Sequence, residues 1–308
     1  MPACLVAAVV CATTPALFAG QSDAEKAHSS FMTGGGMFIV DTDVYAVGTI
    51  VGTKTHHRER TKFATLRLSP VKTLCLYVRI SNFEVDGLKA AFDAQGRCTT
   101  PKSEFLSKYR FTVADGGTWA KDRLTSKRLS GGESSMNPFG QGAPADPDMG
   151  TFMVNEGGSA PRITQSKTAP YVVGGAYMYG PPGSIYFIVA DLQGAARKLE
   201  VIKDERTRYT HCKYTEISRF GVGGSQLHGY RATFDATGTC EVLSTSSGGR
   251  TVDAWDAHQR FTIVDRAGGV GRTDTVQIVD VGTNPGAPKR FPPPSQKIEA
   301  GNFTARPS

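Results

Sequence analysis

The sequence carries the stretch C-L-Y-V-R-I-S-N-F at residues 75–83 and repeats its pattern as C-K-Y-T-E-I-S-R-F at residues 212–220. A second shared stretch follows each one, as G-L-K-A-A-F-D-A-Q-G-R-C and G-Y-R-A-T-F-D-A-T-G-T-C, ending at Cys98 and Cys240. The blocks R-F-T-V-A-D and R-F-T-I-V-D come next in both places. Blocks that recur in a fixed order indicate an internal repeat. We therefore interpret the chain as two copies of one domain.

The repeat extends outward from these blocks to both ends of each copy. Gly-Gly pairs open the two copies, and the short segments G-T-F-M-V from Gly150 and G-N-F-T-A from Gly301 close them. The Pro-rich stretches also correspond, which makes them loops within each copy. We place copy 1 at residues 31–155, a linker at 156–170 and copy 2 at 171–308.

The repeated blocks have the composition of β-strands. They are short, rich in aromatic and β-branched residues, and bounded by Gly and Asp. The 35 Gly and 17 Pro residues indicate many turns rather than long helices. The expected fold class is all-β, with two tandem sandwich-like domains whose strand order the sequence leaves open. A hairpin with its turn near residues 84–86 is expected in copy 1.

Alternation along these strands predicts which side chains face the core. The predicted inward-facing residues of the two copies are Cys75, Tyr77, Ser81, Phe83, Leu88, Ala90 and Phe92, with Cys212, Tyr214, Ser218, Phe220, Tyr230, Ala232 and Phe234 as their counterparts. The opposite face, including Ile80 and Ile217, is expected to be more exposed. This assignment places Arg79 on the inner face, where a charge has no evident partner.

Four cysteines recur in pairs within the copies. A hairpin brings Cys75 towards Cys98, and the same folding brings Cys212 towards Cys240, so one disulfide inside each copy is the economical pairing. Free buried thiols are the alternative. Cys4 and the other N-terminal cysteine fall in a different segment.

That N-terminal segment has the features of an export signal. Residues 1–20 contain no charged side chain and combine a compact apolar run with small residues. The run lacks the basic residue that usually precedes it, so a disordered or mis-started N-terminus is the alternative. We predict a secretory signal peptide and a secreted or extracellular protein, in the periplasm or at a cell surface. No internal stretch has the apolar length of a membrane-spanning helix.

No motif in the sequence specifies an activity. None of the six histidines has a histidine counterpart in the other copy, and neither zinc-ligand spacing nor a G-x-S-x-G nucleophile elbow is present. The glycines at 221–224 lack the spacing of a phosphate-binding loop and indicate a flexible hairpin tip. A secreted hydrolase would need a site in one domain or at the cleft between them, with His228, His258 and Asp256 as candidates.

Two pairs of aspartates flank Gly-rich turns in the two copies. Asp115 with Asp122, and Asp265 with Asp274, could supply oxygen ligands to calcium. A simple hairpin loop, in which Asp and Gly are the usual residues, is the favoured interpretation. We expect no other cofactor and no other metal.

Charge distinguishes the copies more than any motif. Residues 31–130 contain 16 Lys/Arg and 9 Asp/Glu, a net charge of +7, whereas residues 171–280 contain 12 of each. The basic segment of copy 1 consists of Lys54, His56, His57, Arg58, Arg60 and Lys62. Such a patch attracts acidic polysaccharides or a cell surface, although a solvated loop is the simpler interpretation. Export makes nucleic acid an unexpected partner.

The shared blocks resemble a known type of secreted domain. The opening Gly-Gly, the F-D-A-x-G-x-C block, the F-T-[VI]-x-D strand and the closing G-x-F segment together resemble the post-choice-of-anchor type of domain, over residues 34–154 and 174–305. The family's usual F-G-F segment has no counterpart here. This resemblance implies a non-catalytic extracellular β-domain and carries over no catalytic residue.

The expected function is thus a secreted, non-catalytic binding or structural module. A structural surface-layer component is a further alternative, and it would associate with itself rather than bind a soluble ligand. Asn302 opens a glycosylation sequon that lies inside a predicted terminal strand.

Overall fold

The structure is a computed structural model. It describes residues 30–40, 43–52, 62–68, 72–116, 122–131, 149–155, 169–180, 184–193, 197–205, 207–225, 228–244, 250–266, 274–281, 296–297 and 299–307. The predicted signal peptide and most of the predicted linker lie outside these ranges. In the described part of the chain, no helix is long and apolar enough to cross a membrane.

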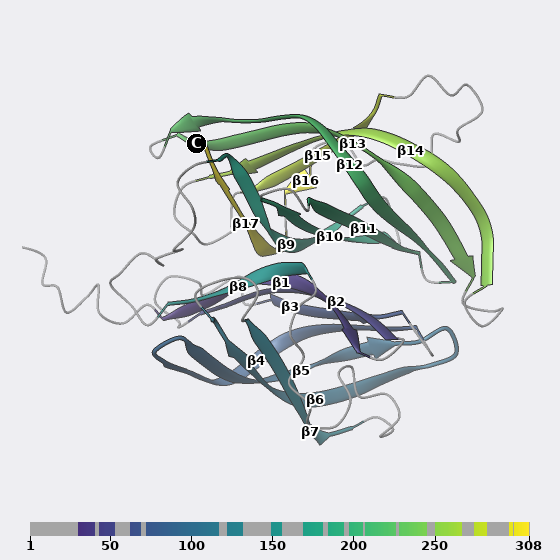
Figure 1. Cartoon of the computed structure of the whole chain (residues 1–308). Helices are drawn as coiled ribbons and strands as arrows, with labels where there is room; N and C mark the ends of the chain where they lie inside the picture. The colour runs from purple at the N-terminus through teal and green to yellow at the C-terminus, as the bar shows by residue number, and fades with distance from the viewer. Residues whose placement is uncertain are drawn as a thin grey trace, which may run out of the picture.

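Regular structure in the described residues consists of β-strands (Figure 1). The strands are β1 (Phe31–Val40), β2 (Asp43–Gly52), β3 (Lys62–Arg67), β4 (Thr73–Asp86), β5 (Lys89–Thr99), β6 (Glu104–Ala114), β7 (Arg123–Ser130), β8 (Met149–Asn155), β9 (Tyr171–Tyr179), β10 (Ser184–Leu192), β11 (Lys198–Glu205), β12 (Arg208–Ser225), β13 (Gly229–Ser244), β14 (Arg250–Asp265), β15 (Thr275–Asp280), β16 (Gln296–Lys297) and β17 (Ala300–Arg306).

Each copy forms one antiparallel sheet in which strands adjacent in the chain pair with each other. The strand order is β7-β6-β5-β4-β3-β2-β1-β8 in copy 1 and β16-β15-β14-β13-β12-β11-β10-β9-β17 in copy 2. The closing strands β8 and β17 thus return to pair with the first strands, β1 and β9. Each sheet curls, so that β17 contacts β13 and β14, and β8 contacts β6. The predicted all-β fold is confirmed, with each copy built as a single curled sheet.

Aromatic side chains fill the inside of each curl. In copy 1, Phe92 stacks on Phe111 with ring centroids 5.7 Å apart, and Phe63 lies edge-on to both. In copy 2, Phe234 stacks on Phe261 at 5.4 Å. All five rings are fully buried. Pairs of this kind add about 0.5–1.5 kcal/mol each beyond the burial of their apolar area, so the same aromatic stack stabilises both copies.

The two predicted disulfides are confirmed. Cys75 is bonded to Cys98 and Cys212 to Cys240, and in each case the two cysteines are directly opposite on neighbouring strands. The bonds close loops with sequence separations of 23 and 28 residues. Loops of this length correspond to about 3 kcal/mol of stabilisation in the chain-entropy model. Each copy is therefore held by its own covalent link.

A β-bulge corrects the predicted inner face of β4. Tyr77 pairs with Gly96 and Arg79 with Gln95, which leaves Val78 as an extra residue. Because side chains alternate along a strand, one extra residue exchanges the two faces beyond it. Arg79 is therefore exposed, which resolves its predicted place against the core.

The same exchange makes the prediction wrong for several other residues. Ser81 and Ser218 are exposed, whereas Ile80 and Ile217 pack against the cores. Copy 2 has the equivalent bulge at Thr215, between the pairs formed by Tyr214 and Glu216. The β4–β5 turn also lies slightly later than predicted, at Gly87 and Leu88. Leu88 is consequently exposed at the hairpin tip instead of inward-facing.

The bulge explains the glycine of the repeated F-D-A-x-G-x-C block. A Cβ on Gly96 would lie 2.1 Å from the Leu76 carbonyl oxygen, and one on Gly238 would lie 2.0 Å from the Lys213 carbonyl oxygen. Contacts this short are not sterically allowed, so only glycine lets the bulged strand approach. Both copies therefore keep glycine here for a structural reason.

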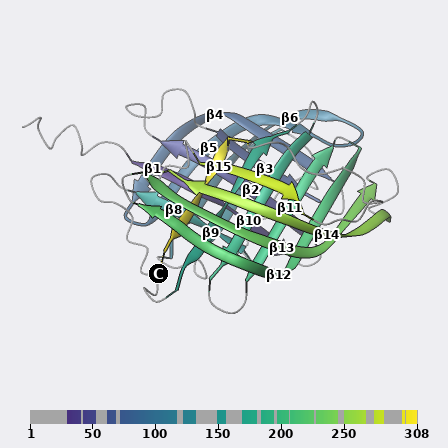
Figure 2. The same ribbon diagram turned by 90° about the horizontal axis from the view of Figure 1, so that it is seen from above.

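The two sheets pack against each other through the outer faces of equivalent strands. β1 and β2 contact β9, β10 and β17, and Figures 1 and 2 show one curled sheet lying on the other. At the centre the backbones of Gly35 and Gly175 touch, because a Cβ on Gly35 would lie 2.7 Å from the carbonyl carbon of Gly175. A shared apolar cluster surrounds this contact and includes Leu66, Leu68 and Tyr209.

One ion pair is buried within this contact between the copies. The Lys72 ammonium group binds the Asp204 carboxylate, and their side chains are 4% and 5% exposed. Burial raises the pKa of Asp204, while the neighbouring Lys72 lowers it. At the edge of the contact, Lys62 forms a more exposed ion pair with Glu299. The two copies are thus joined by buried charges as well as by apolar packing.

Candidate functional site

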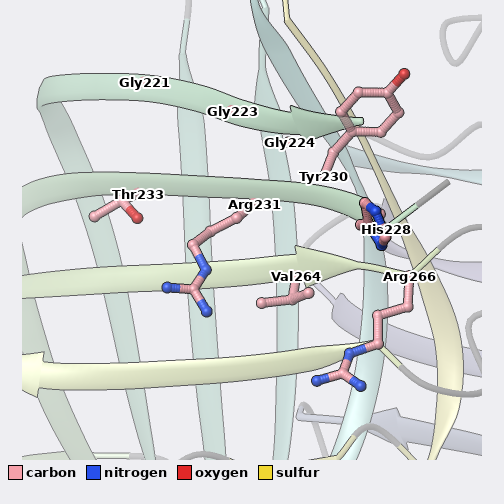
Figure 3. Close-up of a pocket in the computed structure, with 10 residues that line it drawn as sticks. Gly221, Gly223, Gly224, His228, Tyr230, Arg231, Thr233, Val264 and Arg266 are labelled. Atoms are coloured by element: carbon pink, nitrogen blue, oxygen red, sulfur yellow. The ribbon is translucent and has the colours of Figure 1, made fainter. Parts of the chain in front are cut away.

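A depression opens on the outer face of copy 2, at the tip of the β12–β13 hairpin (Figure 3). Its volume is about 590 Å³. The described lining residues are Gly221, Gly223, Gly224, His228, Gly229, Tyr230, Arg231, Thr233, Val264 and Arg266. These residues come from the ends of β12, β13 and β14 and from the segments that follow them.

Two glycines form the floor of the depression. Gly221 pairs with Thr233 and Gly223 pairs with Arg231 across the hairpin. A Cβ on either glycine would meet nothing within 4 Å, and neither has a positive φ angle. Glycine inside a strand is unfavourable because it has no side chain to pack and loses more backbone entropy on folding. The backbone does not require glycine here, so the effect of these residues is to keep the surface open.

Two cationic side chains lie on the β14 side of the depression. Arg231 pairs with Val264 on the neighbouring strand, and Arg266 follows Val264 by two residues on the same side of β14. Figure 3 shows the Arg231 side chain reaching over β14, and Arg266 at the end of that strand. Among the described residues, no carboxylate lies within 4 Å of either guanidinium group, and none lines the depression. The position therefore offers hydrogen-bond donors and positive charge to an anion.

Copy 1 has the opposite charge at the equivalent place. The repeat aligns Gly221 with Glu84 and Gly223 with Asp86. Arg231 corresponds to Lys89, and Arg266 corresponds to a glycine. The copy 1 set therefore sums to −1 (two carboxylates and one ammonium), whereas the copy 2 set sums to +2 (two guanidinium groups). Only copy 2 combines an open floor with positive charge.

No sequence motif marks these arginines. The glycines at 221–224 predict a hairpin tip and His228 is a candidate residue, but the charge of copy 2 sums to zero over residues 171–280 and so conceals a local excess. A position-by-position comparison of the two copies would have shown the loss of two carboxylates and the gain of Arg266. That comparison is informative only when the hairpin register is known.

A second arginine cluster lies next to the depression on the same outer face. Arg260 donates two hydrogen bonds to Asp235, at 2.7 and 3.0 Å, and Arg219 lies 3.5 Å from the same carboxylate. The hydrogen bonds from Arg260 hold the pKa of Asp235 below its ordinary value. In copy 1, Asp93 is held by Arg110 at 3.2 Å and by the Asn82 amide at 2.8 Å. The Asp–Arg pair of the repeated blocks is therefore a shared structural element.

The candidate calcium ligands lie at the closing strands. In copy 2, the Asp274 carboxylate accepts hydrogen bonds from the backbone N–H groups of Arg266 and Phe303, at 3.0 and 3.1 Å. The Asp265 carboxylate accepts the N–H of Ala305 at 3.0 Å. These bonds satisfy donors on the edge of β17 that faces away from β9. The aspartates thus hold the closing strand in place.

Copy 1 repeats this arrangement. Asp122 accepts the N–H groups of Gly116 and Phe152 at 2.9 and 2.7 Å, and Asp115 accepts that of Val154 at 3.2 Å. Within the described ranges, no group of three or more His, Cys, Asp or Glu side chains is arranged to hold a metal ion. Calcium binding by these aspartates stays a prediction.

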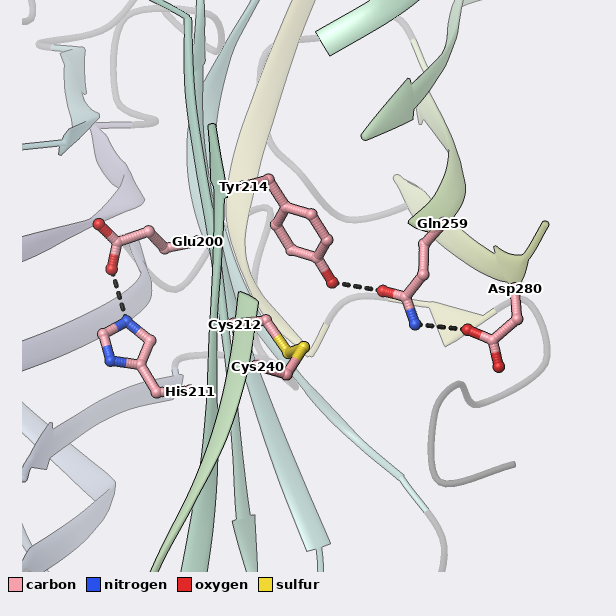
Figure 4. Close-up of a disulfide and its surroundings, with 7 residues drawn as sticks. All are labelled: Glu200, His211, Cys212, Tyr214, Cys240, Gln259 and Asp280. Atoms are coloured by element: carbon pink, nitrogen blue, oxygen red, sulfur yellow. Dashed lines mark hydrogen bonds and ion pairs between the residues drawn. A yellow bond between two sulfur atoms is a disulfide. The ribbon is translucent and has the colours of Figure 1, made fainter. Parts of the chain in front are cut away.

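The candidate hydrolase residues are not brought together. His228 lines the depression, but His258 and Asp256 lie further along β14, opposite Thr237 and Thr239, and both are exposed. Another histidine, His211, lies beside the Cys212–Cys240 disulfide (Figure 4), where its Nε2 is 2.5 Å from a Glu200 carboxylate oxygen.

Figure 4 also shows a polar chain on the other side of the same disulfide. The Tyr214 hydroxyl group donates to the Gln259 side chain, whose amide donates to Asp280 at 2.7 Å. Burial raises the pKa of Tyr214. Each of these groups therefore has a structural partner.

Most of the predicted anion-binding segment of copy 1 falls outside the part of the chain that the structure describes. Lys54, His56, His57, Arg58 and Arg60 lie outside the described residues. The segment's last residue, Lys62, is described and pairs with Glu299 in copy 2, so its charge contributes to the contact between the copies.

The sequon residue Asn302 is 2% exposed. It lies in β17, which pairs with β9 along one edge and is held by the two aspartates along the other. A glycan at this position would therefore have no path to solvent in the folded chain.

Comparison with protein-family models, with curated proteins and with solved structures gives no match for this chain. The resemblance to the post-choice-of-anchor type of domain accordingly stays a prediction.

Proposed function

We propose that the protein is a non-catalytic binding module whose copy 2 binds an acidic polysaccharide in the glycine-floored depression. The observation that carries this proposal is the placement of Arg231 and Arg266 beside an open glycine floor, where copy 1 has carboxylates. Guanidinium groups are suited to bind carboxylate or sulfate groups through paired N–H donors. The charge of Arg266 also acts on the Asp274 carboxylate, whose pKa it lowers. A flat floor without side chains admits a sugar ring close to the backbone.

The lining also favours a glycan over nucleic acid. Single-stranded nucleic acids bind proteins largely by stacking bases on aromatic rings. The one ring in the described lining belongs to Tyr230, and the Arg306 guanidinium covers it at 4.7 Å from the ring centroid. Two disulfides are typical of an oxidising compartment, which supports export as part of the proposal.

Removing the positive charge of the depression, or placing the copy 1 carboxylate on its floor, should weaken the binding. Arg231→Ser and Arg266→Gly should each weaken binding of a sulfated octasaccharide from heparin about 10-fold, because a hydrogen bond to a charged group contributes about 1.5–3 kcal/mol. Gly221→Glu should weaken it further by repulsion, and open space around that position means that the fold tolerates the side chain. Isothermal titration calorimetry measures each dissociation constant.

Two control variants separate this site from other positive charge. Lys89→Ser removes the equivalent charge from copy 1 and should leave binding unchanged. The double variant Arg58→Ser/Arg60→Ser tests the basic segment of copy 1 without disturbing the ion pair of Lys62. If only the double variant weakens binding, the basic segment is the anion site and the depression is not.

The hydrolase and surface-layer alternatives remain predictions without a specific observation in their favour. Release of reducing ends from the octasaccharide would support the first, and concentration-dependent assembly in the absence of ligand would support the second.

A further inference from the structure

The residue at position 219 is unexpected on structural grounds. Arg219 has a φ angle of 50°, in the left-handed region that most side chains avoid. The equivalent residue in copy 1 is Asn82, with a φ angle of 51°. Asparagine tolerates this conformation, and the Asn82 amide donates to Asp93 at 2.8 Å. Both residues lie at a second register shift of the hairpin, between Ser81 and Glu84 in copy 1 and between Ser218 and Gly221 in copy 2. Asparagine satisfies this conformation, so the fold does not explain an arginine.

The neighbouring carboxylate does not explain it either. Asp235 already accepts two hydrogen bonds from Arg260. The Arg219 guanidinium is 3.5 Å from Asp235, and its side chain is 77% exposed. The Asp235 side chain is only 5% exposed, but Arg260 already satisfies it with shorter bonds, so the longer contact of the exposed Arg219 side chain adds little to stability. The side chains of Arg219, Arg260 and Asp235 therefore carry a combined net charge of +1 on this surface.

This charge is continuous with the depression. Asp235 lies four residues beyond Arg231 on β13, a distance of roughly 13 Å along an extended strand. Between them, Thr233 and its partner Thr262 present hydroxyl groups on the same outer face, since the intervening Phe234 and Phe261 point into the core. The outer surface therefore runs from one cationic cluster to the other over polar side chains.

We propose that Arg219 and Arg260 form a second anion subsite, so that the site takes an acidic polysaccharide chain carrying several negative charges rather than a single anionic sugar. The first subsite is the depression with Arg231 and Arg266, and this proposal rests on the function proposed for it. One sugar occupies the depression while a further anionic group of the same chain contacts Arg219. Strain at Arg219 is then the structural cost of a binding contact.

Longer oligosaccharides should accordingly bind more tightly than short ones, and substitution of Arg219 should remove this dependence on oligosaccharide length. Calorimetric titration would compare a sulfated disaccharide with a sulfated octasaccharide, both prepared from heparin. The wild-type protein should bind the octasaccharide at least about 10-fold more tightly, as expected when one further charged contact is made. Arg219→Asn should reduce that advantage to within about 2-fold while leaving disaccharide binding unchanged.

The substitution to asparagine also controls for folding. Because Asn82 occupies the same conformation in copy 1, Arg219→Asn should raise the midpoint of thermal unfolding rather than lower it. Arg79→Asn, at an exposed arginine on the outer face of copy 1, should change neither binding nor its length dependence.

The outcomes distinguish the two proposals. If Arg231→Ser weakens both oligosaccharides while Arg219→Asn leaves the length dependence intact, the second subsite is wrong and the proposed function stands. If neither Arg231→Ser nor Arg266→Gly affects binding, the proposed function fails as well. A single-stranded DNA of comparable charge that binds more tightly than the octasaccharide would overturn the assignment to a glycan.

Discussion

Replacing Lys72 with alanine should lower the free energy of unfolding by about 3–5 kcal/mol, because it leaves the Asp204 carboxylate buried without its ammonium partner. Both side chains are at most 5% exposed, so water cannot substitute for the lost charge. Urea denaturation followed by circular dichroism measures the change, and the slope of the transition shows whether the two copies still unfold together.

A double variant tests the physical reason for this loss. Lys72→Leu with Asp204→Leu removes both charges and should recover most of the stability, since a buried ion pair can often be replaced by apolar residues at little cost. If Lys72→Ala costs under about 1 kcal/mol, the pair is solvated and does not hold the copies together. If the double variant is as unstable as the single one, the loss comes from packing rather than from an unpaired charge.

Asp274 should produce the second large effect, with a distinctive dependence on pH. Burial, followed by the nearby Asp265 charge, raises the pKa of Asp274 to about 7. In the unfolded chain an aspartate titrates near 3.9. Between these values the folded state binds more protons than the unfolded state, so this group's contribution to stability is full at low pH and is lost as pH rises through about 7.

The comparison that isolates this effect is between the wild type and Asp274→Asn. The free-energy difference between the two proteins should shift by up to about 1 kcal/mol per pH unit between pH 5 and 7, in the direction that favours the wild type at the lower pH. The lowered pKa values of Glu205 and Asp235 act only in more acidic solution. A difference independent of pH would mean that Asp274 is ionised throughout.

Asp274→Ala removes both hydrogen bonds from this carboxylate. It leaves the buried N–H of Phe303 without an acceptor and should lower the free energy of unfolding by about 3 kcal/mol at pH 7. Asp86→Ala, at an exposed turn carboxylate, is the matched control and should have an effect within about 0.5 kcal/mol.

The repeat made the larger features of the fold predictable. Two aligned copies gave the disulfide pairing, because a hairpin that contains one cysteine in each strand leaves few alternatives. The closing strands were predictable as well, since the segments at Gly150 and Gly301 recur after loops of otherwise different sequence. Both features follow from the order of the repeated blocks along the chain, and this order can be read directly from the sequence.

The features that the sequence did not predict depend on register. An extra residue at Val78 leaves the hydrophobic pattern intact on either side, so periodicity alone assigned Ser81 to the core. The aspartates near Gly-rich turns have the composition of an ordinary loop, and only the curl of the sheet brings Asp122 to the backbone of β8. The depression was missed for the same reason, because Arg231 belongs to β13 and Arg266 follows β14, and only the register brings them to the glycines of β12.

The buried Lys72–Asp204 pair also determines which surfaces recognise each other. The repeat aligns Lys72 with Tyr209 and Asp204 with Leu68, and those two counterparts both lie in the apolar cluster between the sheets. If copy 1 packed against another copy 1, the ammonium group would face a leucine. If copy 2 packed against another copy 2, the carboxylate would face a tyrosine. Each self-pairing buries an uncompensated charge, so this ion pair favours contact between the two different copies over contact between two identical ones.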